Sequence, residues 1–329
     1  MTRVLVTGAA GFLGEHLVKE LHGAGYVVRA LVRERSLTVS FPADVEVAVG
    51  DLRDARAMRA VTAGCAGVVH LAGKAHVLDE KQSAALDFHG INVEGTRNVL
   101  EGAVAGGASR VVFASTVKVF GETTVGCVDE SQPPFPETPY GQSKWAAEQL
   151  VMDYAKKTGF IAVSLRLPMV YGPTQKGNLF RMIAAIDQGR FPPLPRVNNA
   201  RSMLHVGNFV HATMLALQQP RIGQPAYVVT DEKPYEISAI YDLLRTGLGK
   251  TIPTRRVPLW MLKMGAACGD IMQTATGRSV PVSSSTLEKL IGSAWYSAAA
   301  ITRDLGYCPP YRFNDAVPEM IRFYRASLR

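Results

Sequence analysis

The chain has 329 residues, of which 47% are hydrophobic and 19% charged, and its formal net charge is +8. This length allows one large domain or two smaller ones with a sizeable core, and the balance is that of a globular protein. The basic residues are scattered without a long basic block. Nucleic-acid binding is therefore disfavoured, and an anionic small ligand suits the positive charge.

The cysteines and histidines lack the spacing of a metal site. The four cysteines, Cys65, Cys127, Cys268 and Cys308, are far apart, so free thiols in a reducing cytoplasm are the simplest interpretation. We expect His76, His89 and His205 to be structural or to make polar contacts, because none shows zinc spacing. No metal site is predicted.

No segment has the pattern of a membrane anchor. The start, MTRVLVTGAAGFLG, lacks a basic stretch followed by an apolar run and a cleavage site, so we expect no signal peptide. No apolar run reaches the roughly 18 residues that span a bilayer. The nearest, PLWMLKMGAACGDIM, carries Lys263 and Asp270 and is expected to be a helix of the core or of an interface. The prediction is a cytoplasmic protein without a membrane span.

The first half of the chain alternates short apolar runs with helical stretches. Strands are predicted at 3–7, 27–33, 45–50, 67–72, 109–115 and 161–167, and helices at 11–25, 54–64, about 84–105 and 140–159. Continuous apolar strands between helices indicate a parallel sheet covered on both faces. The expected fold class is α/β, a doubly wound parallel sheet of the Rossmann type, whose ligands bind at the carboxyl ends of the strands.

The pattern changes at about residue 172, where Pro-rich loops and short helices begin. We therefore predict a dinucleotide-binding domain over 1–171. Residues 172–329 are predicted to form mainly a smaller, mixed substrate-binding lobe, with some segments returning to the sheet.

The segment TGAAGFLG follows the first predicted strand and opens the first helix. Small residues let a backbone approach a pyrophosphate, and the free N–H groups of a helix N-terminus bind it. The candidate cofactor-binding residues of this loop are Gly8, Gly11, Phe12, Leu13 and Gly14. Their G-x-x-G-x-x-G spacing is one residue longer than the usual dehydrogenase pattern, and dinucleotide binding is the prediction.

The end of the second strand selects the cofactor. An acidic residue there would bind the adenosine ribose, but the sequence has Val32 and then Arg33, followed by Arg35. A guanidinium can bind a 2′-phosphate and stack on adenine, so NADP(H) is favoured over NAD(H). The alternative is that Arg33 is merely solvated.

Seven motifs occur in one order: TGAAGFLG, GDLRD, VVHLAG, INVEGTRN, ASTVKVFGE, YGQSK and LPMVYGP. Together they resemble the extended short-chain dehydrogenase/reductases, in the nucleotide-sugar epimerase/dehydratase/reductase branch, over nearly the whole chain. The resemblance implies that Asp51 and Leu52 border the adenine, that Ala72 and Gly73 line the nicotinamide side, and that Asn92 lies close behind. It also implies a catalytic triad of Thr116, Tyr140 and Lys144.

The chemistry of these side chains supports the triad independently. Tyr140 and Lys144 are four residues apart and share one face of a helix. Removing a hydride from a carbinol requires a base for the hydroxyl proton. A lysine cation and an oxidised nicotinamide would both lower the pKa of a tyrosine, which is near 10 when unperturbed. Thr116 can hydrogen-bond the substrate oxygen, and Lys144 can also hold the nicotinamide ribose. The alternative, an ordinary pair on a helix surface, leaves the other motifs unexplained.

One departure from the family pattern limits the reaction. Dehydratases of the family carry an acidic pair directly after the Ser/Thr, whereas Val117 and Lys118 follow Thr116 here. Neither side chain can supply the acid that eliminates water, so a dehydratase is disfavoured.

Beyond the sheet, two segments resemble those that hold the nucleotide in UDP-sugar enzymes. In the first, Asn178 and Leu179 are the implied substrate contacts. In the second, Arg201 would bind the diphosphate, because a planar guanidinium suits phosphate; the alternative is a salt bridge within a loop. Ser202 and Asn208 replace two acids of the family pattern, and Asn208 is expected to cap the next helix.

Three functions remain open. The first is an NAD(P)-dependent enzyme acting at C4 of a UDP-sugar through Thr116, Tyr140 and Lys144, either a 4-epimerase or a 4-keto reductase. The second is an NADPH-dependent reductase or dehydrogenase of an apolar carbonyl or sterol-like substrate, whose apolar site Trp260, Met261 and Met264 could line. The third is a catalytically silent dinucleotide-binding regulator. The resemblance also implies a homodimer, paired through the helices near 84–105 and 139–158.

Overall fold

The computed structural model describes residues 2–34, 39, 41–75, 87–175, 177–276 and 283–328. Its centre is a seven-stranded sheet in the order β10-β7-β5-β4-β1-β2-β3, in which every neighbouring pair is parallel. The strands are β1 (Arg3–Thr7), β2 (Val27–Val32), β3 (Glu46–Val49), β4 (Gly67–His70), β5 (Arg110–Thr116), β7 (Ile161–Leu167) and β10 (Ala226–Val228). The predicted doubly wound parallel sheet is confirmed.

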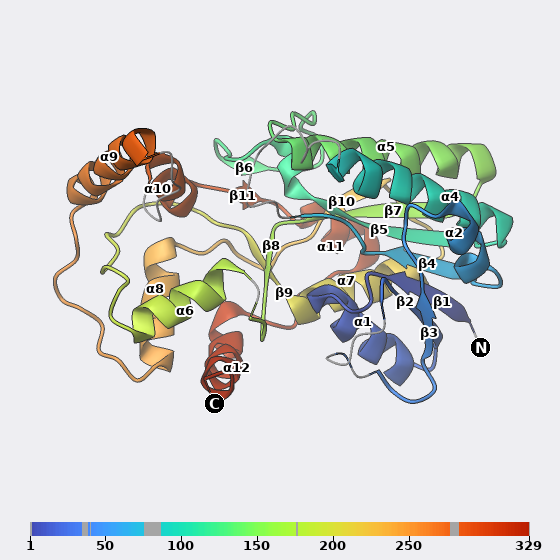
Figure 1. Ribbon diagram of the computed structural model, residues 1–329, viewed down its shortest axis with the longest axis horizontal. Helices are drawn as coiled ribbons and strands as arrows, with labels where there is room; N and C mark the ends of the chain where they lie inside the picture. The colour runs from blue at the N-terminus through green and yellow to red at the C-terminus, as the bar shows by residue number, and fades with distance from the viewer. Residues whose placement is uncertain are drawn as a thin grey trace.

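Helices cover both faces of this sheet (Figure 1). One face carries α2 (Ala55–Thr62), α4 (Gly95–Ala105) and α5 (Pro139–Thr158), and the other carries α1 (Phe12–Gly23), α7 (Val206–Gln218) and α11 (Ala299–Leu305). Alternation along β1 explains the two cores, because Val4 and Val6 pack on the α1 face while Leu5 packs on the α2 face. All three are essentially buried.

The strand order reverses between β1 and β4. These strands are neighbours, with Thr7 opposite His70 in the register, although helices and two strands separate them in sequence. At such a reversal the connections that follow the two strands run in opposite directions, which leaves a crevice at the carboxyl ends of the strands. The fold thereby predicts the ligand site beside the ends of β1, β4 and β5.

The six predicted strands leave out one strand of the sheet. The edge strand β10 pairs with β7, with Tyr227 opposite Leu165, and it lies beyond residue 172. It escaped the sequence pattern because it has only three residues, and tertiary pairing rather than periodicity makes it a strand. The helices α7 and α11 accompany it, so part of the second half of the chain returns to the sheet.

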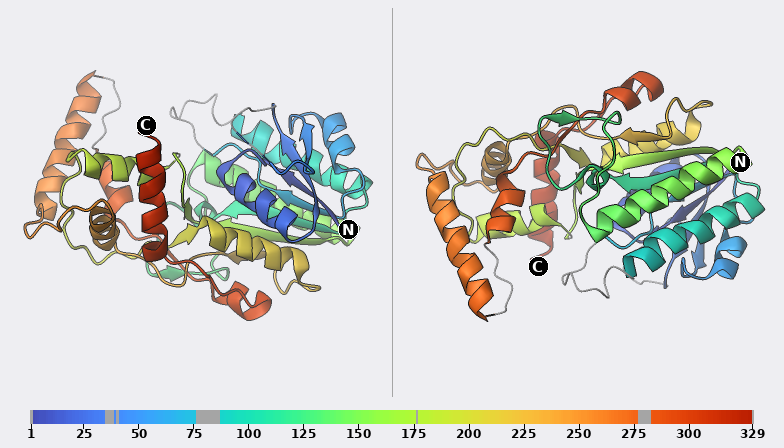
Figure 2. Two further views of the ribbon diagram at one scale, coloured as in Figure 1. Left: turned by 90° about the horizontal axis from the view of Figure 1, so that it is seen from below. Right: turned by 90° about the horizontal axis from the view of Figure 1, so that it is seen from above.

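The remaining second half forms a smaller lobe at one end of the molecule (Figure 2). Its core joins side chains of α6 (Asn178–Asp187), α8 (Ile237–Gly247) and α12 (Phe313–Ala326). Two short parallel pairs lie in the connections, namely β8 (Met169–Tyr171) with β9 (Met203–His205) and β6 (Cys127–Val128) with β11 (Trp295–Tyr296). The helices α9 (Leu259–Thr276) and α10 (Ser284–Ile291) pack on each other at the outer edge of this lobe.

Three expectations can be compared with these elements. The prediction that Asn208 caps a helix is wrong: the His205 side chain caps α7 by accepting from the Gly207 N–H. Asn208 is buried one turn later and donates to the Asp231 carboxylate at 2.6 Å, because that carboxylate needs partners in the core. The four cysteines are free. Within the described residues, no helix is long and apolar enough to cross a membrane.

Candidate active site

The glycine loop is packed too tightly for side chains. A Cβ on Gly14 would lie 2.3 Å from the Gly8 carbonyl oxygen, and one on Gly8 would lie 2.8 Å from the Ala72 nitrogen. Gly8 also has a φ of +68°, which favours glycine. No side chain caps the N-terminus of α1 at Gly11. The loop therefore leaves its backbone open to a ligand, with a helix N-terminus aimed at it.

A buried chain of polar groups ties this loop to the next strands. The Thr7 hydroxyl accepts from the Ala72 N–H at 3.1 Å and lies 2.7 Å from His70 Nδ1. His70 Nε2 is 3.0 Å from the Thr96 hydroxyl, which donates to the Asn92 carbonyl. Burial lowers the pKa of His70 to about 3, so the ring is neutral and serves as a rigid link. Nothing in the sequence distinguished His70 from an ordinary strand residue.

Asn92 lies in a π-helical turn, His89–Glu94, that precedes α4. The prediction over 84–105 was an uninterrupted helix, and residues 84–86 lie outside the described residues. The turn directs the Asn92 amide to accept from the Lys74 N–H at 2.7 Å and to donate to the Ser143 hydroxyl at 2.9 Å. Such π-turns often occur at functional sites. Asn92 thereby connects the loop after β4 to α5.

The far end of the crevice carries charge. Arg33 directly follows β2 and is exposed, and Arg35 lies outside the described residues. Asp51 accepts hydrogen bonds from the Arg53 guanidinium, which lowers the pKa of that carboxyl to about 2, and the positive charge of Arg33 adds to the shift. Leu52 is buried, and its carbonyl accepts from Asn98 at 2.8 Å. Arg53 is a second guanidinium here that the sequence analysis did not single out.

Two local features place Tyr140. Thr138 caps α5 by accepting from the Gly141 N–H at 3.2 Å, and Pro139 begins the helix. A Cβ on Gly141 would lie 2.8 Å from the Lys118 carbonyl oxygen, so the glycine lets the first turn of α5 approach the end of β5. Burial raises the pKa of Tyr140, and a hydrogen bond with the Thr116 side chain lowers it, leaving the pKa above its ordinary value.

Lys144 lies one turn further along α5 and is 6% exposed. Its Nζ lies over the Phe113 ring, 4.0 Å from the ring centre, and a Cβ on Gly73 would be 3.9 Å from it. Burial lowers the pKa of Lys144 to about 7, while the negative charge of Glu148 opposes this shift. The structure therefore brings together the predicted Thr116, Tyr140 and Lys144, with Gly73 beside them.

Glu148 was missed by the sequence analysis. It is fully buried, accepts from the Ser115 hydroxyl at 2.5 Å, and pairs with Arg166 through Oε1 at 2.6 Å. The Arg166 guanidinium lies 4.8 Å from the centre of the Phe120 ring. The charge of Glu148 acts on Lys144, one turn earlier in α5, and raises its pKa. Its one sequence signal was an acid four residues after that lysine, on the same helix face.

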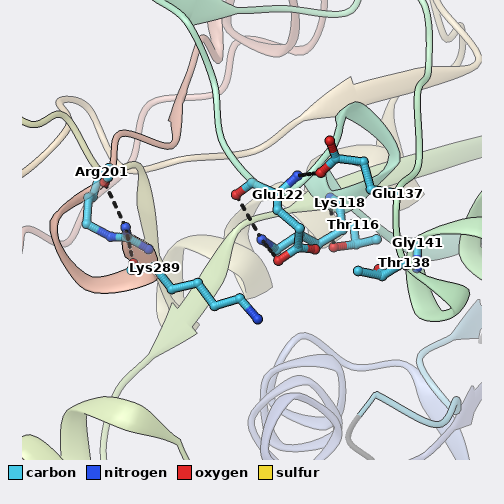
Figure 3. Close-up of polar contacts among 9 residues, drawn as sticks. Thr116, Lys118, Glu122, Glu137, Thr138, Gly141, Arg201 and Lys289 are labelled. Atoms are coloured by element: carbon cyan, nitrogen blue, oxygen red, sulfur yellow. Dashed lines mark hydrogen bonds and ion pairs between the residues drawn. The ribbon is translucent and has the colours of Figure 1, made fainter. Parts of the chain in front are cut away.

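The residues after Thr116 are those expected to exclude a dehydratase. Val117 is buried, and Lys118 pairs with Glu122 at 2.9 Å (Figure 3). The Glu122 backbone N–H in turn donates to the Glu137 carboxylate at 2.8 Å. The Glu122 carboxylate, which follows this segment, is thus paired with Lys118.

The predicted substrate residues lie in two places. Asn178 and Leu179 begin α6 and line a small pocket with Tyr171 and Gly172. Arg201 instead donates from Nη1 to the carbonyl oxygen of Lys289 at 2.7 Å (Figure 3). The same Nη1 donates to the Gly292 carbonyl oxygen at 2.9 Å. It thereby binds the C-terminal end of α10 rather than a carboxylate in a loop.

His205 caps α7, and His76 lies outside the described residues. No group of His, Cys, Asp and Glu in the described part of the chain could hold a metal ion.

The sequence profile of the NAD dependent epimerase/dehydratase family matches residues 4–230. The chain belongs to this family. This is a family of enzymes of the extended short-chain dehydrogenase/reductase type, which depend on nicotinamide nucleotides. The predicted recognition is confirmed.

Individual relatives agree with this assignment. The chain is 30% identical to the UDP-glucose 4-epimerase of Vibrio cholerae, over 99% of this chain and 97% of the relative. It is 28% identical to the N-acetyl-α-D-glucosaminyl-diphospho-ditrans,octacis-undecaprenol 4-epimerase of Escherichia coli O157:H7, over 97% of this chain and 94% of the relative. Among solved structures, a UDP-glucose 4-epimerase with UDP-glucose from Thermotoga maritima superposes with a TM-score of 0.79 at 20% identity, covering both chains completely. At that identity the likeness shows the shared fold.

Proposed function

We propose that this protein is an NAD(P)-dependent oxidoreductase acting at C4 of a UDP-sugar, as a 4-epimerase or a 4-keto reductase. The observation that supports this most is the convergence of Tyr140, Lys144 and Thr116 at the carboxyl end of β5, beside the glycine loop. A dinucleotide fits the loop, because the packing that excludes a Cβ from Gly8 and Gly14 leaves the backbone and the start of α1 open to a pyrophosphate.

In the proposed reaction Tyr140 moves the proton. As the C4 carbinol is oxidised, the Tyr140 phenolate takes the hydroxyl proton, and in the reverse direction the phenol returns it to the C4 oxygen. The Lys144 cation stabilises the phenolate, and the Thr116 hydroxyl holds the sugar oxygen. The nicotinamide, when bound, accepts or returns the hydride. The negative charge of Glu148 raises the pKa of Lys144 and thereby favours its charged form.

The cofactor phosphate is proposed from Arg33. Its exposed guanidinium follows β2, where an acid would otherwise bind the ribose hydroxyls, and NADP(H) is therefore proposed over NAD(H). A cofactor that exchanges at each turnover suits a reductase. An epimerase must recover its cofactor within each cycle, so net consumption of the cofactor distinguishes the two.

Diphosphate recognition is proposed for Arg201, with Asn178 and Leu179 against the nucleotide. Arg201 already donates to two carbonyls, so its remaining N–H groups would serve the ligand. The Vibrio cholerae relative, a UDP-glucose 4-epimerase, supports a sugar linked to uridine diphosphate. The Escherichia coli relative is named for a sugar linked through a diphosphate to undecaprenol. A sugar linked to a polyprenol is therefore the second candidate substrate, and its lipid part would be apolar like the substrate of the alternative hypothesis.

The test is direct. Purified protein is incubated with UDP-glucose, UDP-N-acetylglucosamine and a UDP-4-keto-6-deoxy sugar, with and without NAD(H) or NADP(H), and the products are read by mass and NMR. Isomerisation at unchanged mass without cofactor consumption identifies an epimerase. Gain of two hydrogens with matching NADPH loss identifies a 4-keto reductase.

A matched pair of variants assigns the turnover to the proposed base. Tyr140→Phe removes the phenol, and we expect a loss of at least about 100-fold in turnover, the usual contribution of general acid–base catalysis. Tyr154→Phe removes a phenol from the same helix, where it bonds Glu101 at 3.4 Å, and should leave turnover unchanged. Equal effects of both variants would contradict the role of Tyr140. No turnover of any sugar by the wild type, with cofactor still bound, would move the apolar-carbonyl hypothesis to the front.

The domain and assembly predictions remain proposals. We propose that 1–171 binds the dinucleotide and that 172–329 mainly binds substrate. We also propose a homodimer formed by the outer faces of α4 and α5, where Val104 is 39% exposed. Light scattering of wild type and Val104→Asp checks the assembly, because a charge at a two-fold interface faces its own copy.

A further inference from the structure

The helix α9 exposes more apolar surface than any core helix should. It has 18 residues, of which Lys263 and Asp270 carry charge. The exposed fractions of its large apolar side chains are Trp260 62%, Met261 48%, Met264 60%, Ile271 70% and Met272 56%. Single exposed apolar residues are ordinary, but a contiguous group of this kind marks an interaction surface.

Helical geometry shows how these side chains are arranged. At about 100° per residue, Trp260, Met264 and Ile271 lie almost in one line along the helix, and Met261 and Met272 lie beside that line. We call these five residues the α9 face. The exposed Cys268 lies between them, and the exposed Ala267 and Gly265 lie at the two edges, so the uncharged surface covers about 160° of the helix circumference.

The opposite side of α9 is already occupied. Ala266 is fully buried, and Leu262 packs against the core of the smaller lobe. Asp270 accepts from the Ser284 N–H at 3.0 Å at the start of α10. The helix is therefore held in the fold by this side, and the large side chains of the α9 face are exposed.

The views of the molecule agree on the position of this helix. Figures 1 and 2 both place α9 at the outer edge of the smaller lobe, at the end of the molecule opposite the seven-stranded sheet. Its neighbour α10 ends at the carbonyls that Arg201 binds. The helix α9 thus packs on the helix whose C-terminal end binds Arg201.

The charge around the α9 face selects its partner. Residues 249–292 contain six Lys and Arg residues and two acidic residues. Lys250 and Arg256 pair with Asp187 and Asp242, whereas Lys263 on α9 and Arg255 four residues before the helix are exposed and have no ion-pair partner in the described part of the chain. An apolar helix face with unpaired cations on and just before the helix complements an anionic lipid surface. Trp260, at the beginning of the helix, is the residue type that prefers the membrane–water interface.

A second copy of the chain suits this surface less well. A two-fold contact is self-complementary, so the same cations of both copies would face one another. A bilayer avoids that repulsion. Because no described helix can cross a membrane, α9 would lie in the plane of the interface rather than span it.

We propose that α9 is a membrane-surface helix, which inserts the α9 face into the headgroup region of an anionic bilayer. This surface does not depend on the proposed reaction. It would hold the enzyme at the surface where substrates carried on a lipid are found.

The test uses the full chain and sedimentation with vesicles of phosphatidylcholine alone or mixed with phosphatidylglycerol. The wild type should bind the mixed vesicles, more weakly at high salt, with a blue shift and brominated-lipid quenching of tryptophan fluorescence that Trp260→Phe removes. Because burial of a Met or Ile side chain favours insertion and a glutamate opposes it, Met264→Glu/Ile271→Glu should bind at least about tenfold more weakly.

The matched control is Val125→Glu/Leu328→Glu, which adds the same charge at exposed apolar residues outside α9. It should bind like the wild type, and retained cofactor binding confirms that both double variants are folded. The proposal is overturned if the wild type stays in the supernatant with anionic vesicles, or if the α9 variant binds them as the wild type does. It is also overturned if light scattering reveals a dimer that the α9 variant dissociates while vesicles are not bound, since a second copy would then cover the face.

Discussion

Replacing Glu148 by Gln tests the buried charge pair that Glu148 forms with Arg166, next to Lys144. Glu148 is completely buried and Arg166 is 5% exposed. The carboxylate accepts from Arg166 Nη2 at 2.6 Å and Nε at 3.1 Å, and from the Ser115 hydroxyl at 2.5 Å. Glutamine has nearly the same shape and keeps one acceptor oxygen that can face Arg166, while its NH2 group can donate to the Ser115 hydroxyl, which also accepts. The variant therefore loses the negative charge, together with the longer contact from Arg166 Nε to the second carboxylate oxygen at 3.3 Å.

The larger effect comes from Arg166, which cannot lose its proton. In the variant its charge stays buried beside the Phe120 and Trp145 rings, whose centres are 4.8 and 5.8 Å from the guanidinium carbon, and the Glu130 carboxylate still interacts with it. Removing one partner of a buried ion pair costs about 3–5 kcal/mol. Because glutamine keeps an acceptor, we expect the lower end, a loss of about 3 kcal/mol in the free energy of unfolding.

The assay is equilibrium denaturation by urea at neutral pH, with fluorescence and circular dichroism as two probes of a single transition. The set comprises Glu148→Gln, Arg166→Met and the double variant. The double variant should be less destabilised than the sum of the single ones, because it leaves no unpaired charge. A loss below about 1 kcal/mol in Glu148→Gln, or strict additivity of the two substitutions, would refute the reasoning.

Three further outcomes are expected. Gly14→Ala places a Cβ 2.3 Å from the loop carbonyl and should weaken NADPH binding at least about tenfold, whereas Gly23→Ala in the same helix, with nothing within 4 Å, should not; calorimetry decides. Lys144 has a folded-state pKa lowered to about 7, against about 10.4 unfolded, so the unfolded chain binds more protons between these values. Its contribution to stability should rise with pH across that window, and the melting temperature of wild type relative to Lys144→Met should rise likewise; a constant difference would contradict the shifted pKa. Arg33→Asp should favour NADH over NADPH by removing the proposed partner of the 2′-phosphate, and an unchanged ratio of their dissociation constants would leave Arg33 as a solvated side chain.

The polar chain from Thr7 to Asn92 explains how a site built from distant segments stays in register. Thr7 ends β1, His70 ends β4, and Asn92 holds the Lys74 backbone and the Ser143 hydroxyl of α5. Each of these groups is buried and bonded, which fixes one arrangement. The neutral His70 ring links the glycine loop to the helix that carries the proposed base.

The sequence by itself determined the features that depend on local pattern. Continuous apolar strands between helices predicted the parallel sheet, because both faces of such strands are buried. The glycine spacing predicted the tight loop after β1, and the distance of four residues between Tyr140 and Lys144 predicted a shared helix face. The confirmed family assignment rests on the order of these motifs.

Only the tertiary structure decided what distant segments do for one another. The strand β10 exists because β7 offers it an edge, and Asn208 turns into the core because the buried Asp231 needs a donor. The same holds for Glu148 and Arg166, which are buried together from α5 and β7. The exposure of α9 was equally invisible, because an apolar helix has the same pattern whether it is covered or bare. Periodicity reports which face a residue shares, but the partner that satisfies a buried polar group or covers an apolar face is chosen by non-local packing.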